Sequence, residues 1–128
     1  MATLKKETGD FGENVGIEYL VKKGYKIVAK NYRFKNFGEI DLVAKKNGKL
    51  IFFEVKTRNK LYSLHYPTWT SITIRKRRSL RRICNIFIQN NKEYTDKKWR
   101  VDVLFIELDG RNVANIEHLE NILWESYY

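Results

Sequence analysis

Polar and apolar residues alternate along two neighbouring stretches of the chain, residues 37–45 and 49–58. An alternation with a period of two is typical of β-strands. The stretches are joined by Asn47 and a glycine, a pair that favours a tight hairpin turn because both residues tolerate positive φ. A two-residue turn sets a register in which Asp41 lies opposite Glu54. The pattern therefore predicts an antiparallel hairpin in which two acidic residues face each other.

The rest of the pattern predicts two helices and three further strands. A helix is expected over residues 8–23, because Thr8 begins a run with N-cap chemistry and Gly24 can end a helix. The strands are expected over residues 25–31, 99–108 and 111–116. A second helix is expected over residues 73–89, with an apolar face formed by Leu80, Ile83, Ile86 and Phe87.

The order helix, three strands, helix, two strands predicts an α/β fold: a single domain, residues 1–128, with a central mixed β-sheet flanked by helices. The length of 128 residues, with 43% hydrophobic residues, suits one globular domain with its own core. Residues 59–70 are expected to form an irregular loop. The segment 119–128 is expected to be either a short helix or an aromatic-rich cover.

The alternation assigns faces to the hairpin side chains. In the first strand Ile40, Leu42 and Ala44 are expected in the core, and Glu39, Asp41 and Val43 on the other face. In the second strand Phe53 and Val55 are expected in the core, and Glu54 and Lys56 on the face of Asp41.

Directly opposed residues of a hairpin have Cβ atoms about 4.5–5.5 Å apart, where like charges are destabilising unless something neutralises them. A divalent cation would neutralise Asp41 and Glu54, and Lys56 would stand beside it as a third polar group. Two ordinary explanations stay open: a solvated strand face for the acids, and a cross-strand ion pair between Glu39 and Lys56, which this register places opposite each other.

The composition indicates an anionic partner. The chain has 25 Lys and Arg against 15 Asp and Glu, a formal net charge of +10. This excess favours nucleic acid first and a membrane surface second, with solubility as the ordinary alternative. Cys84 is the only cysteine, which suggests a reducing compartment. No apolar run approaches the roughly 20 residues of a membrane-spanning helix. A cytoplasmic protein without membrane association is therefore expected.

The metal that such a chain would hold must be bound by oxygen ligands. His65 and His118 are too few and too scattered for a zinc site, and Cys84 has no partner motif. Mg²⁺ or Mn²⁺ is therefore the expected cofactor.

Taken together, these motifs resemble the YraN-like, predicted endonuclease-related group of the PD-(D/E)XK nuclease superfamily, with relatives among the Holliday-junction resolvases. The resemblance covers nearly the whole chain, although Ile40 stands where the superfamily name has proline. The matching motifs are G-E at 12–13, G-Y at 24–25, N-Y-R at 31–33, G-E-I-D-L-V-A at 38–44, F-F-E-V-K-T-R at 52–58, W-R-V-D at 99–102 and I-E-H-L-E-N at 116–121.

The resemblance implies a restriction-endonuclease-like core and a division of roles. Asp41, Glu54 and the backbone carbonyl of Val55 would bind the metal. Lys56 would orient or help to deprotonate the attacking water, and Glu13 on the first helix would complete the acidic shell. Glu18 lies on the same helix and is the alternative to Glu13.

The second predicted helix is basic. Arg75, Arg78 and Arg82 recur at i, i+3 and i+7, so they share one helical face that suits a phosphate backbone. Lys76 lies on another part of the helix, matches a lysine of the family pattern, and is placed to approach the site. Arg58, after the E-x-K motif, is counted with these nucleic-acid-binding candidates. A solvated helix face is the alternative.

Other polar and aromatic residues are assigned more ordinary roles. Tyr62, Tyr66 and Trp69 either stack on unpaired bases or pack as a lid or core. Arg100 and Asp102 are expected to point outward as a structural pair. Cys84 is expected to be a buried thiol, and both histidines are assigned to the surface or to packing.

The leading functional hypothesis is a metal-dependent DNA nuclease that hydrolyses phosphodiester bonds, selective for DNA shape such as branches, flaps or single strands. RNA stays open as a substrate, and a homodimer is compatible with the sequence. The alternative is a catalytically silent nucleic-acid-binding module in DNA processing, recombination or uptake.

Overall fold

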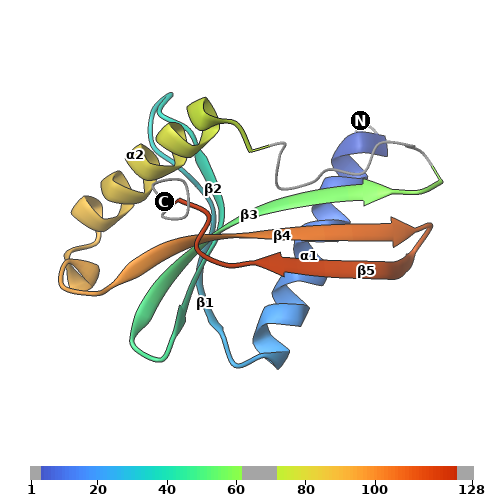
Figure 1. The fold of residues 1–128 in the computed structure, drawn as a ribbon, viewed down its shortest axis with the longest axis horizontal. Helices are drawn as coiled ribbons and strands as arrows, with labels where there is room; N and C mark the ends of the chain where they lie inside the picture. Colours follow the sequence, from blue (N-terminus) through green and yellow to red (C-terminus); the bar gives the residue numbers. More distant parts are fainter. Residues whose placement is uncertain (1–3, 62–71, 124–128) are drawn as a thin grey trace.

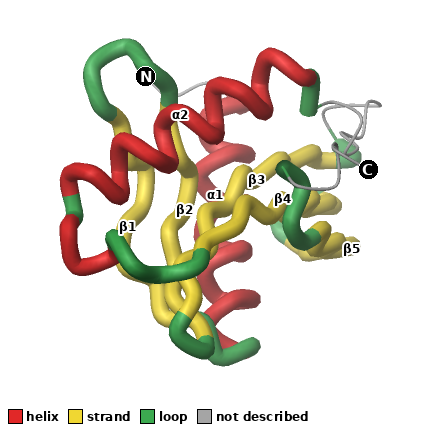
Figure 2. The backbone as a smooth tube through the Cα atoms, turned by 60° about the vertical axis from the view of Figure 1, so that its left-hand side comes forward, coloured by secondary structure: helices red, strands yellow, loops and turns green. Residues whose placement is uncertain are grey.

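The computed structural model describes residues 4–61 and 72–123, which form a five-stranded mixed sheet with one helix on each face. Figures 1 and 2 show α1 and α2 on opposite sides of the strands. The predicted fold class, a single α/β domain with a restriction-endonuclease-like core, is confirmed. In chain order the elements are α1 (Leu4–Lys22), β1 (Lys26–Arg33), β2 (Glu39–Lys46), β3 (Lys49–Asn59), α2 (Ile74–Asn90), the 3₁₀ turn η2 (Lys92–Tyr94), β4 (Trp99–Asp109) and β5 (Asn112–Leu119).

The predicted hairpin is β2–β3, and its register is the one that the two-residue turn requires. Asn47 and Gly48 both have positive φ, 51° and 74°. Val43 pairs with Phe52, and the last backbone pair towards the site is Leu42 with Phe53. The strands separate beyond this pair, so Asp41 and Glu54, which were predicted to lie directly opposite each other, are not a backbone pair of the sheet.

The sheet order is β1-β2-β3-β4-β5, and β3–β4 is the parallel pair among antiparallel neighbours. A parallel pair needs a crossover connection, because the chain must return to the same end of the sheet. Helix α2 lies within this crossover and packs on one face of the sheet, while α1 packs on the other. Among the described residues, neither helix is long and apolar enough to cross a membrane.

Both faces of the sheet are therefore packed against a helix, and one of the predicted face assignments is wrong. Val43 was expected on the polar face with Asp41, but it is fully buried in the cluster beneath α2. Ile40 belongs to that same cluster, whereas Leu42 lies in the cluster beneath α1. Ile40 lies beyond the last backbone pair with β3, so the simple alternation is interrupted there.

Several predicted boundaries also change. Helix α1 begins at Leu4, so Thr8 lies inside the helix and the predicted N-cap is wrong. A surface ion pair between Lys6 and Asp10, one helical turn apart, accompanies this earlier start. Strand β5 continues to Leu119, so the predicted tail begins as a strand. Tyr62, Tyr66 and Trp69, to which two alternative roles were assigned, lie outside the described residues.

Candidate active site

Asp41 occupies the point where β2 and β3 separate. Its Oδ2 accepts a hydrogen bond of 2.7 Å from the backbone N–H of Val55. The side chain thus binds a backbone donor of β3 next to the last backbone pair of the hairpin. This bond fixes the carboxylate against β3, beside the E-x-K segment.

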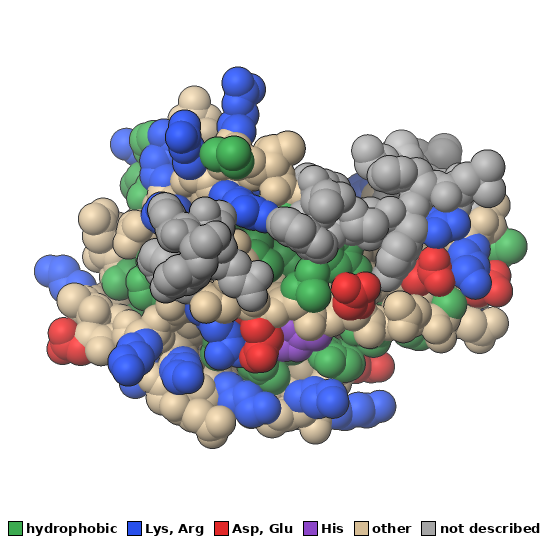
Figure 3. Space-filling view, in the orientation of Figure 1, with side chains coloured by type: hydrophobic (Ala, Val, Ile, Leu, Met, Phe, Trp, Pro, Cys, Tyr) green, Lys and Arg blue, Asp and Glu red, His purple; other side chains and the backbone are tan. Residues whose placement is uncertain are grey.

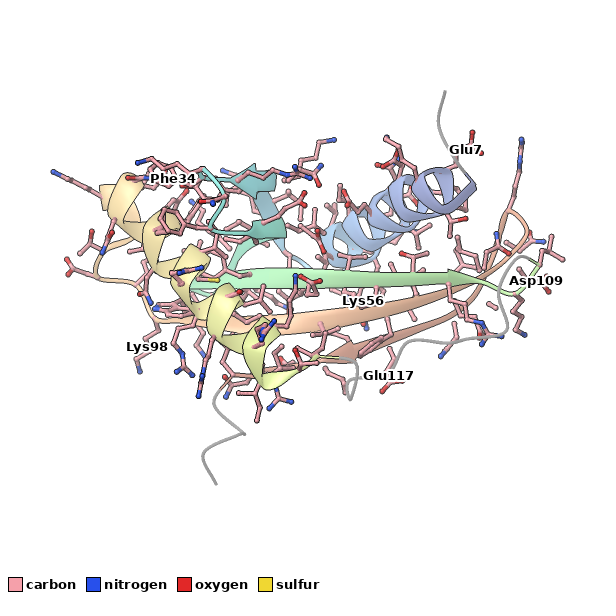
Figure 4. The ribbon with its side chains drawn as sticks, turned by 90° about the horizontal axis from the view of Figure 1, so that it is seen from above. Glu7, Phe34, Lys56, Lys98, Asp109 and Glu117 are labelled. Carbon is pink, nitrogen blue, oxygen red and sulfur yellow. The ribbon has the colours of Figure 1, made fainter. Side chains whose placement is uncertain are left out.

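Glu54 lies on the face of β3 that meets α2, and its side chain is only 8% exposed. Two lysines approach the same oxygen: Lys56 Nζ lies 3.5 Å from Oε1, and Lys76 Nζ, from α2, lies 3.6 Å from it. Figure 4 shows Lys56 on β3, which passes between the two helices in this view. The structure therefore brings together the predicted residues Glu54, Lys56 and Lys76.

The electrostatics of Asp41 show that the acidic residues form one group. Burial first, and then the charge of Glu54, raise the pKa of the Asp41 carboxyl from 3.8 to about 7, while the hydrogen bond from Val55 opposes this. Glu13 and Glu39 add smaller contributions in the same direction. Like charges held together away from water disfavour ionisation. The site therefore gathers several acidic side chains whose charges act on one another.

Glu13 enters this group because α1 approaches β3 closely at the preceding glycine. A Cβ built on Gly12 would lie 2.0 Å from Oγ1 of Thr57, so no side chain fits there without a shift. Burial raises the pKa of Glu13, while a hydrogen bond from the Asn31 side chain lowers it. Glu18 is exposed. Of the two α1 candidates, the structure brings Glu13 into electrostatic contact with Asp41.

Glu39 is the acidic residue whose place the sequence reasoning missed. It was expected opposite Lys56, but its carboxylate accepts a 3.0 Å bond from Arg33 on β1. The expected opposition of Glu39 and Lys56, on which the alternative of a cross-strand ion pair depended, is therefore wrong, because the β2–β3 pairs stop before reaching it. The positive φ of Gly38, 130°, gives a structural reason for the glycine that opens the G-E-I-D motif.

The donor set suits a hard divalent cation. Carboxylate oxygens are the ligands that Mg²⁺ and Mn²⁺ prefer. The pKa of Asp41 is raised chiefly by burial and then by the charge of Glu54, so the two carboxyls act on each other. Across residues 4–61 and 72–123, however, no group of three or more His, Cys, Asp or Glu side chains is arranged to hold a metal ion. A metal here would be held by the two carboxylates together with backbone or water oxygens.

The residues predicted to bind nucleic acid divide into two sets. Arg75, Arg78 and Arg82 are exposed on the helix surface, as their spacing predicted. Figure 3 shows Lys and Arg side chains over the region of α2 and along the lower edge of the same face. Arg58 differs, because its guanidinium donates to Glu107 on β4 at 3.0 Å and its side chain is mostly buried. The structure thus places Arg58 in an ion pair within the sheet.

A second polar cluster lies on the α1 side of the sheet. Asp102 accepts bonds from Arg100 Nε and from the backbone N–H of Asn121, both at 2.9 Å. The predicted Arg100–Asp102 pair is confirmed, but its outward direction is wrong, since Asp102 is completely buried. His118 Nε2 lies 2.8 Å from Asp102 Oδ2 and had been assigned only surface or packing. Cys84 is buried as predicted, and burial raises the pKa of its thiol.

The two-helix mixed sheet with a D…E-x-K hairpin places the chain in the restriction-endonuclease-like class of α/β domains. Comparison with known proteins then gives the family: residues 12–106 match the model of UPF0102, described as an uncharacterised protein family. The chain belongs to this family, which confirms the YraN-like resemblance.

Relatives in the family match along most of their length. A UPF0102 protein of Caldicellulosiruptor saccharolyticus is 37% identical over 118 residues, 91% of this chain and 97% of the relative. One of Clostridioides difficile is 39% identical over 111 residues, covering 87% and 94%. One of Fusobacterium nucleatum is 37% identical over 119 residues, covering 93% and 92%.

Proposed function

We propose that this protein is a Mg²⁺- or Mn²⁺-dependent nuclease that hydrolyses phosphodiester bonds of DNA. The observation that carries the proposal is the convergence of Asp41, Glu54 and Lys56 where β2 and β3 separate. A buried Glu54 beside two lysines and a partly buried Asp41, with the pKa of Asp41 raised to about 7, form a group whose cost to stability a functional role would explain.

In this proposal Asp41, Glu54 and the backbone carbonyl of Val55 hold the cation, and Glu13 completes the acidic shell. A divalent cation bound there would polarise the phosphate and lower the pKa of a coordinated water. Lys56 positions the attacking water and stabilises charge that develops on the phosphate. Hydrolysis would join the oxygen of a water to phosphorus as the ester P–O bond on the opposite side breaks. The attacking water would give up one proton, and the leaving oxygen would take one up.

The substrate class follows from the charge of the surface. Arg75, Arg78 and Arg82 bind phosphates along the exposed face of α2. The first turn of this helix lies beside the acidic site, because Lys76 contacts Glu54. Phosphate contacts position a nucleic acid but carry no base sequence. We therefore propose selection by DNA shape, such as branches, flaps or single strands, in a cytoplasmic protein that acts as a monomer or a homodimer.

The test is a panel of end-labelled linear, flapped, forked, four-way and single-stranded DNAs, with matched RNAs, incubated with Mn²⁺ or Mg²⁺. We expect the native chain to cut at least one branched, flapped or single-stranded DNA, and Lys56→Ala to lose cutting while it retains DNA binding. Lys60→Ala is the matched control, because Lys60 directly follows β3, lies outside the acidic group and has a side chain that is about half exposed.

The alternative is a nucleic-acid-binding module without catalysis. It predicts salt-dependent DNA affinity that does not change with metal or with substitution of Asp41, Glu54 or Lys56. If the native chain cleaves no member of the panel and binds DNA in this way, the nuclease proposal is wrong and the module remains.

A further inference from the structure

The first turn of α2 carries charges of the wrong sign for a helix N-terminus. Thr73 caps the helix, with its hydroxyl accepting from the backbone N–H of Lys76 at 3.1 Å. In a typical capping box the residue three positions after the cap is acidic, whereas here it is Lys76, and the turn contains no acid. Cations near a helix N-terminus are unfavourable because of the helix dipole. Local helix stability therefore does not explain the lysine.

The site offers a more specific explanation for Lys76. Its ammonium lies 3.6 Å from Oε1 of Glu54, the oxygen that Lys56 also approaches at 3.5 Å. The side chain of Lys76 is 40% exposed and that of Glu54 is 8% exposed. A flexible, partly hydrated cation thus reaches from α2 onto a buried carboxylate of the sheet.

A count of charges suggests why two lysines are present. With both carboxylates ionised, Asp41 and Glu54 carry two negative charges, which Lys56 and Lys76 balance. Counting these four side chains alone, a divalent cation would leave a surplus of two positive charges, which Glu13 would lower to one. Two changes relieve this surplus: an ammonium leaves Glu54, and an anionic phosphate enters. Lys76 is the better placed to leave, because it is more exposed than Lys56 and belongs to the neighbouring helix.

We propose that Lys76 is a second lysine of the site that exchanges partners. Without metal it neutralises Glu54, and when a divalent cation takes that carboxylate it moves to a phosphate oxygen of the substrate. Lys76 would thereby compete with the metal and favour its binding together with DNA. This inference rests on the proposed nuclease function and adds a positioning residue from α2 to it.

The test measures Mn²⁺ affinity without DNA, by titration calorimetry, in the native chain, Lys76→Gln and Arg75→Gln. Arg75 is the matched control, since it is exposed in the same helical turn and its substitution removes the same charge. We expect Lys76→Gln to tighten Mn²⁺ binding about three- to tenfold, the scale of one ammonium at a partly exposed site, and Arg75→Gln to change it less than about twofold. Lys76→Arg, which keeps the charge, should bind Mn²⁺ as the native chain does.

The second measurement repeats the Mn²⁺ titration in the presence of DNA. Addition of a non-cleavable phosphorothioate DNA should tighten Mn²⁺ binding in the native chain, and this coupling should weaken in Lys76→Gln. Unchanged or weaker Mn²⁺ binding in Lys76→Gln, with native binding that still depends on Glu54, would overturn the exchange and leave the nuclease proposal intact. An absence of Mn²⁺ binding by the native chain, with and without DNA, would instead overturn the metal site and the exchange with it.

Discussion

His118 Nε2 lies 2.8 Å from Oδ2 of Asp102, a carboxylate with no exposed surface. The pair joins two motifs that lie apart in the sequence, W-R-V-D on β4 and I-E-H-L-E-N at the end of β5. The backbone N–H of Asn121 donates to the other oxygen of the same carboxylate, so the residues after β5 are fixed to β4. Both motifs therefore help to hold β5 and the residues after it against β4.

The first prediction concerns Asp102. Asp102→Ala should lower the free energy of unfolding by about 3–5 kcal/mol, because it leaves Arg100 and His118 without their buried partner. Urea unfolding followed by circular dichroism measures this loss. Glu120→Gln is the control, because Glu120 binds the same arginine from an exposed position and should cost no more than about 1 kcal/mol. Equal effects of the two substitutions would contradict the structural role of the buried carboxylate.

The second prediction concerns the contact between α1 and β3. Gly12→Ala should destabilise the protein by about 1–3 kcal/mol, because the new Cβ would meet Thr57 at 2.0 Å and force the helix to shift. Gly9→Ala is the matched control in the same helix, since its Cβ would have no neighbour within 4 Å. It should stabilise the protein by up to about 1 kcal/mol through helix propensity. Urea unfolding of both variants should therefore give opposite signs.

The third prediction concerns pH. The pKa of Asp41 is raised to about 7 in the folded protein from 3.8, so the folded state binds more protons than the unfolded state between these values. The contribution of Asp41 to stability then falls as pH rises from about 4 to 7, because ionisation of Asp41 costs more in the folded protein. Asp41→Asn removes this cost, and its amide oxygen can still accept from Val55.

The variant should therefore gain stability over the native chain as pH rises, by about 2–4 kcal/mol between pH 4 and pH 8 without metal. Urea unfolding at a series of pH values, in the presence of a chelator, measures the difference. A gain of the same size at both ends of the range would show that folding does not raise the pKa of the Asp41 carboxyl.

The fourth prediction concerns metal. If Mg²⁺ binds with a dissociation constant of about 1 mM, about 10 mM Mg²⁺ should stabilise the native chain by about 1.4 kcal/mol. That is an increase in Tm of roughly 3–5 °C for a chain of this size. Glu54→Gln should abolish the increase, whereas Glu117→Gln, on exposed β5, should preserve it. Differential scanning calorimetry with and without Mg²⁺ provides the measurement.

The fifth prediction concerns the exposed face of α2. Substitution of Arg75, Arg78 and Arg82 by Gln should reduce the slope of log affinity against log salt by about 2.7 for duplex DNA, because each phosphate contact contributes about 0.9. Fluorescence anisotropy at several salt concentrations measures the slope. As the control, a triple substitution of Lys22, Lys23 and Lys26 to Gln removes the same charge around the C-terminal end of α1 and the start of β1. An equal loss in that control would indicate a general charge effect.

The sequence predicted the parts of the fold that depend on local chemistry. The Asn47-Gly48 turn fixed the hairpin register, because both residues adopt the positive φ that such a turn requires. The amphipathic pattern of α2 identified its buried residues, Leu80 and Ile83 among them. Elements with one strongly preferred local conformation are the ones that a single sequence can define.

The errors arose where tertiary packing overrides the local pattern. The buried position of Val43 and the changed place of Glu39 both follow from the separation of β2 and β3, which no local spacing encodes. His118 was missed because its partner lies on another strand and its neighbours, such as Tyr19, lie on α1. The approach of Lys76 to the site was expected, whereas its sharing of one oxygen with Lys56 required the structure.

The mixed topology also implies an order of assembly during folding. Strands β1, β2 and β3 follow one another through short connections, so their pairing needs only local loop closure. The pairing of Leu50 with Trp99 must wait until the chain through α2 has been closed into a much larger loop. We expect the nascent hairpin to gather Asp41 and Glu54 early and to meet Lys76 late. The two carboxylates would then repel each other until Lys76 of α2 packs beside Glu54.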